Sequence, residues 1–261
     1  MRLLIHKNYE DLCRWTADYI ANRITDFNPQ KDKPFVLGLP TGSSPLGVYR
    51  ELIGKNREGK LSFKNVITFN MDEYIGLPPN NPQSYRFFIN ENLFKHVDVC
   101  PENTHIPNGM ASDPEAECRS YEEKIIAVGG IELFFGGMGH NGHLAFNEPG
   151  SSLVSRTRAV KLNHETREAN ARFFSNDKSH VPATAMTVGL GTVMDAREVL
   201  VIVSGHGKAR SLAAAVEDGV SEWVPVSCLQ THPRAIIACD EDAAGDLKYS
   251  TVQHYRDAEN R

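Results

Sequence analysis

The sequence predicts an α/β fold with a mainly parallel sheet covered by helices on both faces. Short apolar segments typical of buried strands alternate along the chain with segments of helical periodicity. Polar or glycine-rich loops follow several of these strands, at the position where open α/β sheets place ligands. No internal repeat, low-complexity segment or linker divides the 261 residues, so a single domain spanning 1–261 is expected.

The first half of the chain alternates expected strands and helices in this order. Leu12, Ile20 and Ile24 can share one face of the helix that follows the first strand. The apolar run at 34–39 ends at Pro40, which stops a strand. The expected strands are 1–6, 34–39 and 66–69, and the expected helices are 8–27, 46–56, 84–96 and 114–128.

The second half continues the alternation. A buried strand is expected at 131–135, and the polar, basic segment 151–158 follows the loop after it. The remaining expected elements are helices at 164–174 and 209–216, strands at 198–203 and 234–238, and a polar helical tail at 246–261.

Composition and charge exclude several classes of function. The net charge of −5 and the pI near 6.1 disfavour nucleic-acid and membrane-surface binding. The five cysteines are scattered without a CxxC pair, as expected for free thiols in a reducing cytosol, and their spacing predicts no metal site. The first six residues are too short for a secretory segment, and no stretch approaches the roughly 18 apolar residues of a membrane span. We therefore expect a cytoplasmic protein with no nucleic-acid or membrane partner.

The segment 136–149 is the strongest candidate for a reaction centre. Four glycines in seven residues are expected to break regular structure and to let a ligand approach the backbone. A glycine-rich turn carrying incidental polar residues would explain one histidine. The combination of His143, Glu148 and the stop at Pro149 favours catalysis.

Two strand-to-helix turns have features of anion sites. The turn 41–45 precedes a helix, so backbone N–H groups, hydroxyls and the positive end of the helix dipole converge there. An ordinary N-cap at Ser44 is the alternative. Lys208 ends a second such turn, and its position fits a phosphate-binding lysine and an ordinary surface lysine equally well. Arg172, considered alone, is more typical of a solvated surface charge than of a ligand-binding residue. The absence of a Gly-Lys-Ser/Thr motif disfavours a nucleoside triphosphate.

Two acidic residues follow the strand at 66–69. In an extended chain, adjacent side chains point in opposite directions, so at most one of Asp72 and Glu73 should enter a cleft. A solvated acidic turn explains these two residues equally well.

Residues 69–74 (Phe-Asn-Met-Asp-Glu-Tyr) and 142–149 (Gly-His-Leu-Ala-Phe-Asn-Glu-Pro), together with 37–42, resemble the glucosamine-6-phosphate deaminase family. The resemblance extends from Met1 to about Tyr255. It implies a Rossmann-like three-layer sandwich and a hydrolase of amino-sugar catabolism, including N-acetylglucosamine utilisation. Such an enzyme converts glucosamine 6-phosphate and water to fructose 6-phosphate and ammonia. The resemblance also implies no cofactor or metal, and a homohexamer, as is common among bacterial members.

Matching positions imply roles for individual residues. Asp72 would be the base that moves a proton between C2 and C1, because a C–H next to an aldehyde is a weak acid and requires a positioned carboxylate. His143 would open the pyranose ring with Glu148 beside it, since imidazole exchanges protons near neutral pH. The resemblance assigns the 6-phosphate to Thr41, Gly42, Ser43, Ser44, Arg172 and Lys208.

The sequence departs from the family pattern at two places. Position 141 is Asn where some members carry Asp, so the helper role for His143 is expected to fall more heavily on Glu148. The second concerns the family's pocket for the activator N-acetylglucosamine 6-phosphate, where Val160 replaces a lysine and His254 replaces a tyrosine, so weakened or lost activation is expected. The possible allosteric residues that do match are Ser151, Ser152, Arg158 and Tyr121.

Two other functions share the broad fold. In a 6-phosphogluconolactonase-like hydrolase the glycine–histidine loop usually continues Thr-Ala-Ser-Leu-Phe-Pro, whereas this chain has Leu-Ala-Phe-Asn-Glu-Pro. A non-catalytic sugar-phosphate sensor would keep the phosphate site and could lose Asp72 and His143, both of which are present. The sequence therefore favours the deaminase.

Overall fold

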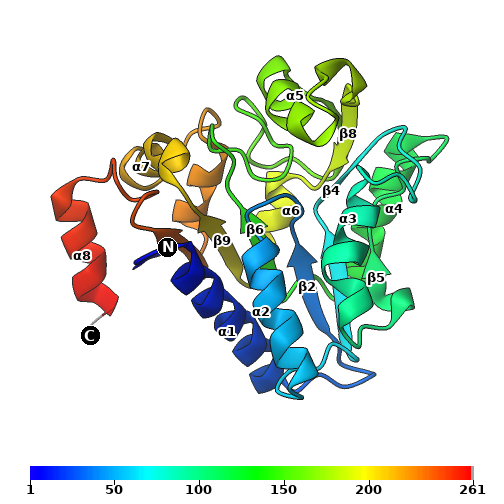
Figure 1. Ribbon diagram of the computed structural model, residues 1–261, viewed down its shortest axis with the longest axis horizontal. Coiled ribbons are helices and arrows are strands. Elements are labelled where there is room, and N and C mark those ends of the chain that lie inside the picture. Colours follow the sequence, from blue (N-terminus) through cyan, green and yellow to red (C-terminus); the bar gives the residue numbers. More distant parts are fainter. Residues whose placement is uncertain (260–261) are drawn as a thin grey trace.

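The computed structural model describes residues 1–259, the side chain of residue 169 excepted, and contains the expected α/β sandwich (Figure 1). Seven parallel strands form the central sheet in the order β1-β10-β9-β6-β2-β3-β5. The strands are β1 (Arg2–His6), β2 (Phe35–Leu39), β3 (Val66–Asn70), β5 (Thr104–His105), β6 (Leu133–Gly137), β9 (Val199–Val203) and β10 (Ala235–Asp240). The predicted parallel sheet is confirmed.

Helices pack against both faces of this sheet. Alternation along the fully buried β9 shows why two cores form, since Val199, Val201 and Val203 join one apolar cluster while Leu200 and Ile202 join the other. The face of Leu200 is covered by α1 (Tyr9–Phe27), α2 (Leu46–Arg57) and α3 (Tyr85–Asn92). The face of Val201 is covered by α4 (Pro114–Ala127), α6 (Leu190–Met194), α7 (Ala209–Glu217) and α8 (Tyr249–Glu259).

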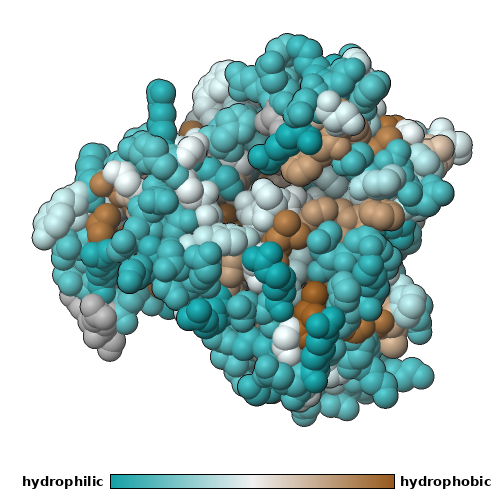
Figure 2. Space-filling view, viewed as in Figure 1, coloured by the Kyte–Doolittle hydropathy of each residue, from teal (hydrophilic) through white to brown (hydrophobic). Residues whose placement is uncertain are grey.

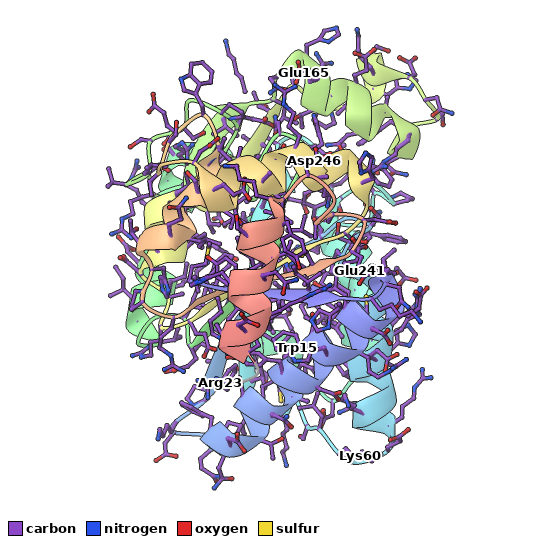
Figure 3. All side chains as sticks on the ribbon, turned by 90° about the vertical axis from the view of Figure 1, so that its left-hand side faces the viewer. Trp15, Arg23, Lys60, Glu165, Glu241 and Asp246 are labelled. Atoms are coloured by element: carbon purple, nitrogen blue, oxygen red, sulfur yellow. The ribbon has the colours of Figure 1, made fainter. Side chains whose placement is uncertain are left out.

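A separate helix, α5 (His164–Asn170), lies over the carboxyl edge of the sheet. Figure 3 shows its residue Glu165 at the end of the molecule opposite Lys60. Short 3₁₀ turns complete the elements: η1 (Phe94–His96), η2 (Pro101–Asn103), η3 (Ala171–Phe173), η4 (Lys178–His180), η5 (His206–Lys208) and η6 (Pro225–Thr231). Among residues 1–259, no helix is both long and apolar enough to cross a membrane.

A small antiparallel sheet was not predicted from the sequence. It contains β4 (Asp72–Tyr74), β8 (Thr184–Thr187) and β7 (Arg158–Lys161), in that order. The segment 151–158 was described only as polar and basic, and no strand was expected there, but Arg158 begins β7. These strands are short and rich in polar residues, so their pairing depends on partners distant in the chain and leaves little local pattern. The helix α6 was missed as well.

The expectation that regular structure ends at Gly136 is wrong. The strand β6 continues through Gly137, and these two glycines pair with Val201 and Ile202 of β9. A Cβ at Gly136 would lie 3.0 Å from Leu144 Cδ1, which is closer than most real contacts. The missing side chain therefore lets the following loop fold back against the strand rather than breaking it.

Strand order brings the candidate loops together. The strands β9, β6, β2 and β3 are neighbours, and all are parallel, so their carboxyl ends share one edge of the sheet. The segments that follow these ends are 204–208, 138–149, 41–45 and 71–74. Each is one of the segments in which the sequence suggested chemistry.

Candidate active site

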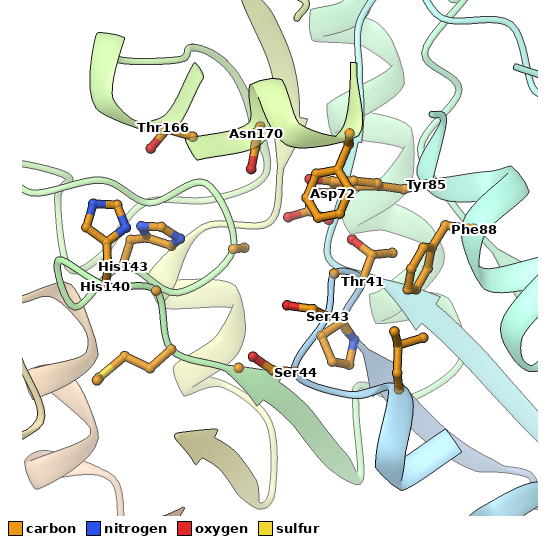
Figure 4. A pocket seen from close by; sticks show the side chains of 18 of the residues that line it. Thr41, Ser43, Ser44, Asp72, Tyr85, Phe88, His140, His143, Thr166 and Asn170 are labelled. Carbon is orange, nitrogen blue, oxygen red and sulfur yellow. The ribbon is translucent and has the colours of Figure 1, made fainter. Parts of the chain in front are cut away.

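A pocket of about 890 Å³ lies at this edge, and Thr166 and Asn170 of α5 line it. Figure 2 shows hydrophobic residues gathered in a hollow between the part of the molecule around α5 and the helices below it. In Figure 4, Asp72 and His143 lie on opposite sides of the pocket, with Ser43 and Ser44 at one end and Thr166 above. The pocket therefore brings together side chains from segments that are far apart in the sequence.

The turn after β2 supplies one wall. Thr41, Gly42, Ser43 and Ser44 all line the pocket, and Gly42 has the positive φ of 93° that a glycine adopts without strain. The N-cap of α2 is Pro45, which makes no side-chain cap, so the N-cap role considered for Ser44 is wrong. The Ser44 hydroxyl instead accepts a hydrogen bond of 3.1 Å from Lys208 Nζ.

Two cations face the same space. Lys208 comes from η5 and Arg172 from η3, and both line the pocket. The pKa of Lys208 is lowered to about 8, chiefly by burial, with Asp240 opposing the shift and the charge of Arg172 adding to it. Asp240 also accepts hydrogen bonds from Ser204 and from the Gly205 N–H, which fixes the turn that carries Lys208. Two cations held in one partly dehydrated wall are suited to a phosphate.

The acidic pair divides as the extended geometry predicted. Asp72 lines the pocket, whereas the Glu73 carboxylate accepts backbone N–H groups of Tyr85 and Arg86 at 2.9 Å and so holds the start of α3. Asp72 is 6% exposed and Glu73 2%. The alternative of a solvated acidic turn is therefore wrong.

Burial dominates the ionisation of Asp72. The pKa of this carboxyl is about 8, because burial and, to a smaller extent, the charge of Glu73 raise it while a hydrogen bond from Thr41 opposes the rise. Within the described residues, Asp72 Oδ1 has no hydrogen-bond partner. A carboxyl with a pKa close to neutral and a free oxygen on a pocket wall is a much stronger base than an exposed one.

The imidazole of His143 is held through an amide. Its Nδ1 lies 2.6 Å from Asn141 Oδ1 and 3.8 Å from Glu148 Oε2, while Asn141 Nδ2 donates to Glu148 Oε2 at 2.8 Å. The sequence placed the helper role mainly on Glu148, but Asn141 contacts the ring directly and Glu148 holds Asn141. The order is therefore imidazole, amide, carboxylate.

Burial lowers the pKa of His143 to about 4, although Glu148 opposes the shift, so the ring is neutral at neutral pH. Gly139 makes room for it, because a Cβ there would lie 2.1 Å from the imidazole. A neutral ring whose Nδ1 faces an acceptor carries its proton on Nδ1 and has a free lone pair on Nε2.

The possible allosteric residues lie outside the pocket lining. The Ser151 N–H donates to the Glu148 carbonyl at 2.9 Å, and Ser152 follows in the same loop. Arg158 donates to Asn147 Oδ1 at 2.8 Å, and the buried Tyr121 hydroxyl donates to the Asn70 carbonyl at 2.7 Å. Their regulatory role stays a prediction.

Sequence reasoning missed several residues of the pocket. Tyr74 lies two positions after Asp72 on β4 and therefore on the same side, which was the available signal. Asn170 donates to its hydroxyl at 2.9 Å. The other lining residues that were missed include Tyr85, Phe88, His140, Phe146, Thr166 and Phe174. In the described part of the chain, no group of three or more His, Cys, Asp or Glu side chains is arranged to hold a metal ion.

Comparison of sequences identifies related proteins. The profile of a family described as glucosamine-6-phosphate isomerases/6-phosphogluconolactonase matches residues 7–237. Glucosamine-6-phosphate deaminase of Parabacteroides distasonis is 57% identical over 259 residues, which span 99% of this chain and 96% of that protein. The protein of the same name from Treponema denticola is 56% identical over 259 residues, which span 99% of this chain and 96% of that protein.

Solved structures of lower sequence identity have the same fold as this chain. The structure of a monomeric glucosamine-6-phosphate deaminase superposes with a TM-score of 0.90 at 40% identity, covering 94% of this chain and 100% of that one. A 6-phosphogluconolactonase from Thermotoga maritima superposes with a TM-score of 0.72 at 21% identity, covering 92% and 99%. The second likeness extends to the fold alone.

Proposed function

The chain belongs to the family of glucosamine-6-phosphate isomerases and 6-phosphogluconolactonases, and from that premise we propose that it converts glucosamine 6-phosphate and water to fructose 6-phosphate and ammonia. The protein is an enzyme of sugar-phosphate metabolism. One observation carries the assignment of the site: a buried carboxylate and a neutral imidazole face each other across a pocket that also holds two cations.

The first step opens the sugar ring at His143. The free Nε2 lone pair takes the proton from the O1 hydroxyl, and the C1–O5 bond breaks as the C1 carbonyl forms. The imidazolium then returns the proton to O5. A pKa near 4 makes the imidazolium a strong acid, so it gives the proton to the ring oxygen readily.

The second step moves a proton at Asp72. Once C1 is an aldehyde, the adjacent C2–H becomes acidic, and the carboxylate takes its proton while the electron pair moves onto O1. The O1 oxygen takes a proton from the ammonium group on C2, which gives an enolamine. The carboxyl then returns its proton to C1, leaving a hydroxyl on C1 and an iminium at C2. The positive charge of the substrate's ammonium group stabilises the ionised form of Asp72 and so lowers the pKa of this carboxyl from about 8. Substrate binding therefore makes the base available.

The last step releases ammonia. Water adds to the C2 iminium, the C2–N bond breaks, and the C2 carbonyl of fructose 6-phosphate forms. The 6-phosphate lies far from these carbons, so its attraction to Lys208 and Arg172 serves orientation rather than chemistry. All atoms are balanced by one water consumed and one ammonia released.

Neither alternative function has a specific observation in its favour. Hydrolysis of a lactone gives no role to a carboxylate placed to abstract a C–H proton. A non-catalytic sensor gives no reason for the costly burial of Asp72. The relatives at 56–57% identity that span 99% of this chain are both called deaminases, whereas the lactonase likeness lies at 21%.

The test is an assay of ammonia release with glucosamine 6-phosphate, run beside the N-acetylated sugar phosphate and beside 6-phosphogluconolactone hydrolysis. We expect ammonia from the first substrate only. Lactone hydrolysis without ammonia release would overturn the proposal in favour of the first alternative. Tight binding of the amino sugar with no turnover would favour the sensor.

The assembly and location belong to the same proposal. We expect a cytoplasmic enzyme, because the five cysteines are all free thiols. A homohexamer is the expectation from family resemblance, whereas one solved relative is described as monomeric. Sedimentation equilibrium decides between these two states.

A further inference from the structure

The Glu148 carboxylate is fixed by three side-chain donors. Asn141 and Asn163 donate their amide N–H groups to Oε2 at 2.8 and 2.9 Å, and Thr166 donates its hydroxyl to Oε1. The side chain is only 14% exposed, so water competes little for these positions. A carboxylate only accepts hydrogen bonds, and three donors from different directions leave it one orientation.

Two of the donors belong to the start of α5. Asn163 is the N-cap of this helix, and its Oδ1 accepts the Thr166 N–H at 2.7 Å while its Nδ2 reaches Glu148. Thr166 is 3% exposed and lines the pocket. Figure 4 shows it above His143. The first turn of α5 and the Glu148 carboxylate therefore hold each other in place.

The orientation of Glu148 decides the orientation of the imidazole. Because Glu148 only accepts, Asn141 must turn its Nδ2 toward it and its Oδ1 toward His143. That oxygen fixes the proton on Nδ1 and leaves Nε2 as the base. The His143 backbone N–H also donates to this oxygen, but at 3.3 Å it is a longer bond than the 2.8 Å bond to Glu148. If Glu148 turned away, the amide could flip at the cost of that one long bond, and its NH₂ group would then favour the tautomer with the proton on Nε2.

We infer that Asn163 and Thr166 are positioning residues that set the His143 tautomer for ring opening, through Glu148 and then Asn141. The inference rests on the proposed function and deepens it. The helix that carries Thr166 continues directly into η3, which presents Arg172 to the pocket. One short segment thus connects the anion-binding wall with the proton-transfer group.

Two substitutions separate this role from helix stability. Thr166→Val keeps the branched shape and removes the hydroxyl. Asn163→Asp keeps the N-cap, since Asp and Asn cap equally well, but replaces the donor with an acceptor that repels Glu148. Thr166→Ser is the conservative variant that retains the hydroxyl. Glu165→Ala is the matched control, because its exposed side chain lies in the same turn.

The first readout is kinetic and uses glucosamine 6-phosphate deuterated at C2. In wild type we expect C2–H cleavage to contribute to the rate and to give an isotope effect on kcat/KM. In Thr166→Val and Asn163→Asp we expect ring opening to become slow and kcat/KM to fall by about 10–100-fold, the loss typical of groups that orient a catalytic ligand. Because C2–H cleavage would then no longer limit the rate, the isotope effect should approach one. A fall with an undiminished isotope effect would contradict the inference.

The second readout needs no substrate. Nitrogen-15 NMR of the imidazole is expected to show a single Nδ1–H tautomer in wild type and Glu165→Ala, and a mixture in Thr166→Val and Asn163→Asp. Thr166→Ser should restore the wild-type signal. An unchanged tautomer in both test variants overturns the inference even if the wild type releases ammonia. Failure of wild type to release ammonia overturns the proposed function and leaves the NMR result to decide the positioning role.

Discussion

Replacing the buried base should stabilise the protein while destroying its activity. Asp72→Asn removes a carboxyl whose pKa rises from its ordinary 3.8 to about 8 in the folded chain. Between these values the folded protein holds a proton that the unfolded chain has released, so this carboxyl makes stability fall as pH rises from about 4 to about 8. An asparagine at this position does not titrate and therefore causes no such loss of stability. The stability advantage of the variant should therefore grow across this range.

The shift sets the magnitude. At about 1.4 kcal/mol for each pKa unit, the rise to about 8 corresponds to an upper limit of about 5–6 kcal/mol above pH 8. Water in the open pocket screens part of it, so we expect a difference of about 3 kcal/mol in the free energy of unfolding. That is a large fraction of the total stability of a typical protein.

Urea unfolding at about pH 5 and about pH 9 measures this difference. Wild type and Asp72→Asn should be close in stability at the lower pH and separate at the higher one. The exposed Glu165→Gln removes a carboxylate without burial and should show no such trend. An Asp72→Asn variant with the same advantage at both pH values, or with none, would refute the reasoning that burial controls this carboxyl.

Three further predictions concern activity. Lys208→Ala should raise KM about 10–100-fold with kcat largely kept, because it removes a charge that attracts the phosphate. Lys60→Ala, which removes an exposed lysine, should leave KM unchanged, and a loss confined to kcat in Lys208→Ala would contradict the phosphate role. Gly139→Ala should lower kcat at least about 10-fold, since the added methyl would lie 2.1 Å from the His143 ring, whereas Gly54→Ala meets nothing within 4 Å; equal activity of the two variants would show that the ring tolerates displacement. The kcat/KM profile should be a narrow bell around pH 8, with Asp72 ionising on its acid side and Lys208 losing charge on its alkaline side; a profile flat across that range contradicts both assignments.

The central sheet was predictable because its strands carry their own signal. β9 is a run of five apolar residues that are all buried, so its sequence alone indicates a strand covered on both faces. The small sheet has no such signal, because β7 is Arg-Ala-Val-Lys and none of its residues is fully buried. Its pairing with β8 forms only once the central sheet has brought these distant segments together.

The site was predictable in its residue types and less so in its connections. Asp72 and Lys208 follow strands of the central sheet, so the topology rule brings them to one edge. The order His143, Asn141, Glu148 depends on which amide atom faces which neighbour, and sequence does not specify this. Thr166 reaches Glu148 only because α5 folds back over the loop, a contact with no local pattern.

The most direct test of the central claim follows the C2 deuterium of labelled glucosamine 6-phosphate through turnover by wild type and Asp72→Asn. If one carboxyl carries the proton from C2 to C1, wild type should release ammonia and deliver part of the deuterium label to C1 of fructose 6-phosphate. In the variant, turnover should fall by about 10²–10⁴-fold while sugar-phosphate binding persists. Unchanged turnover in Asp72→Asn would contradict the assignment of this carboxylate as the base.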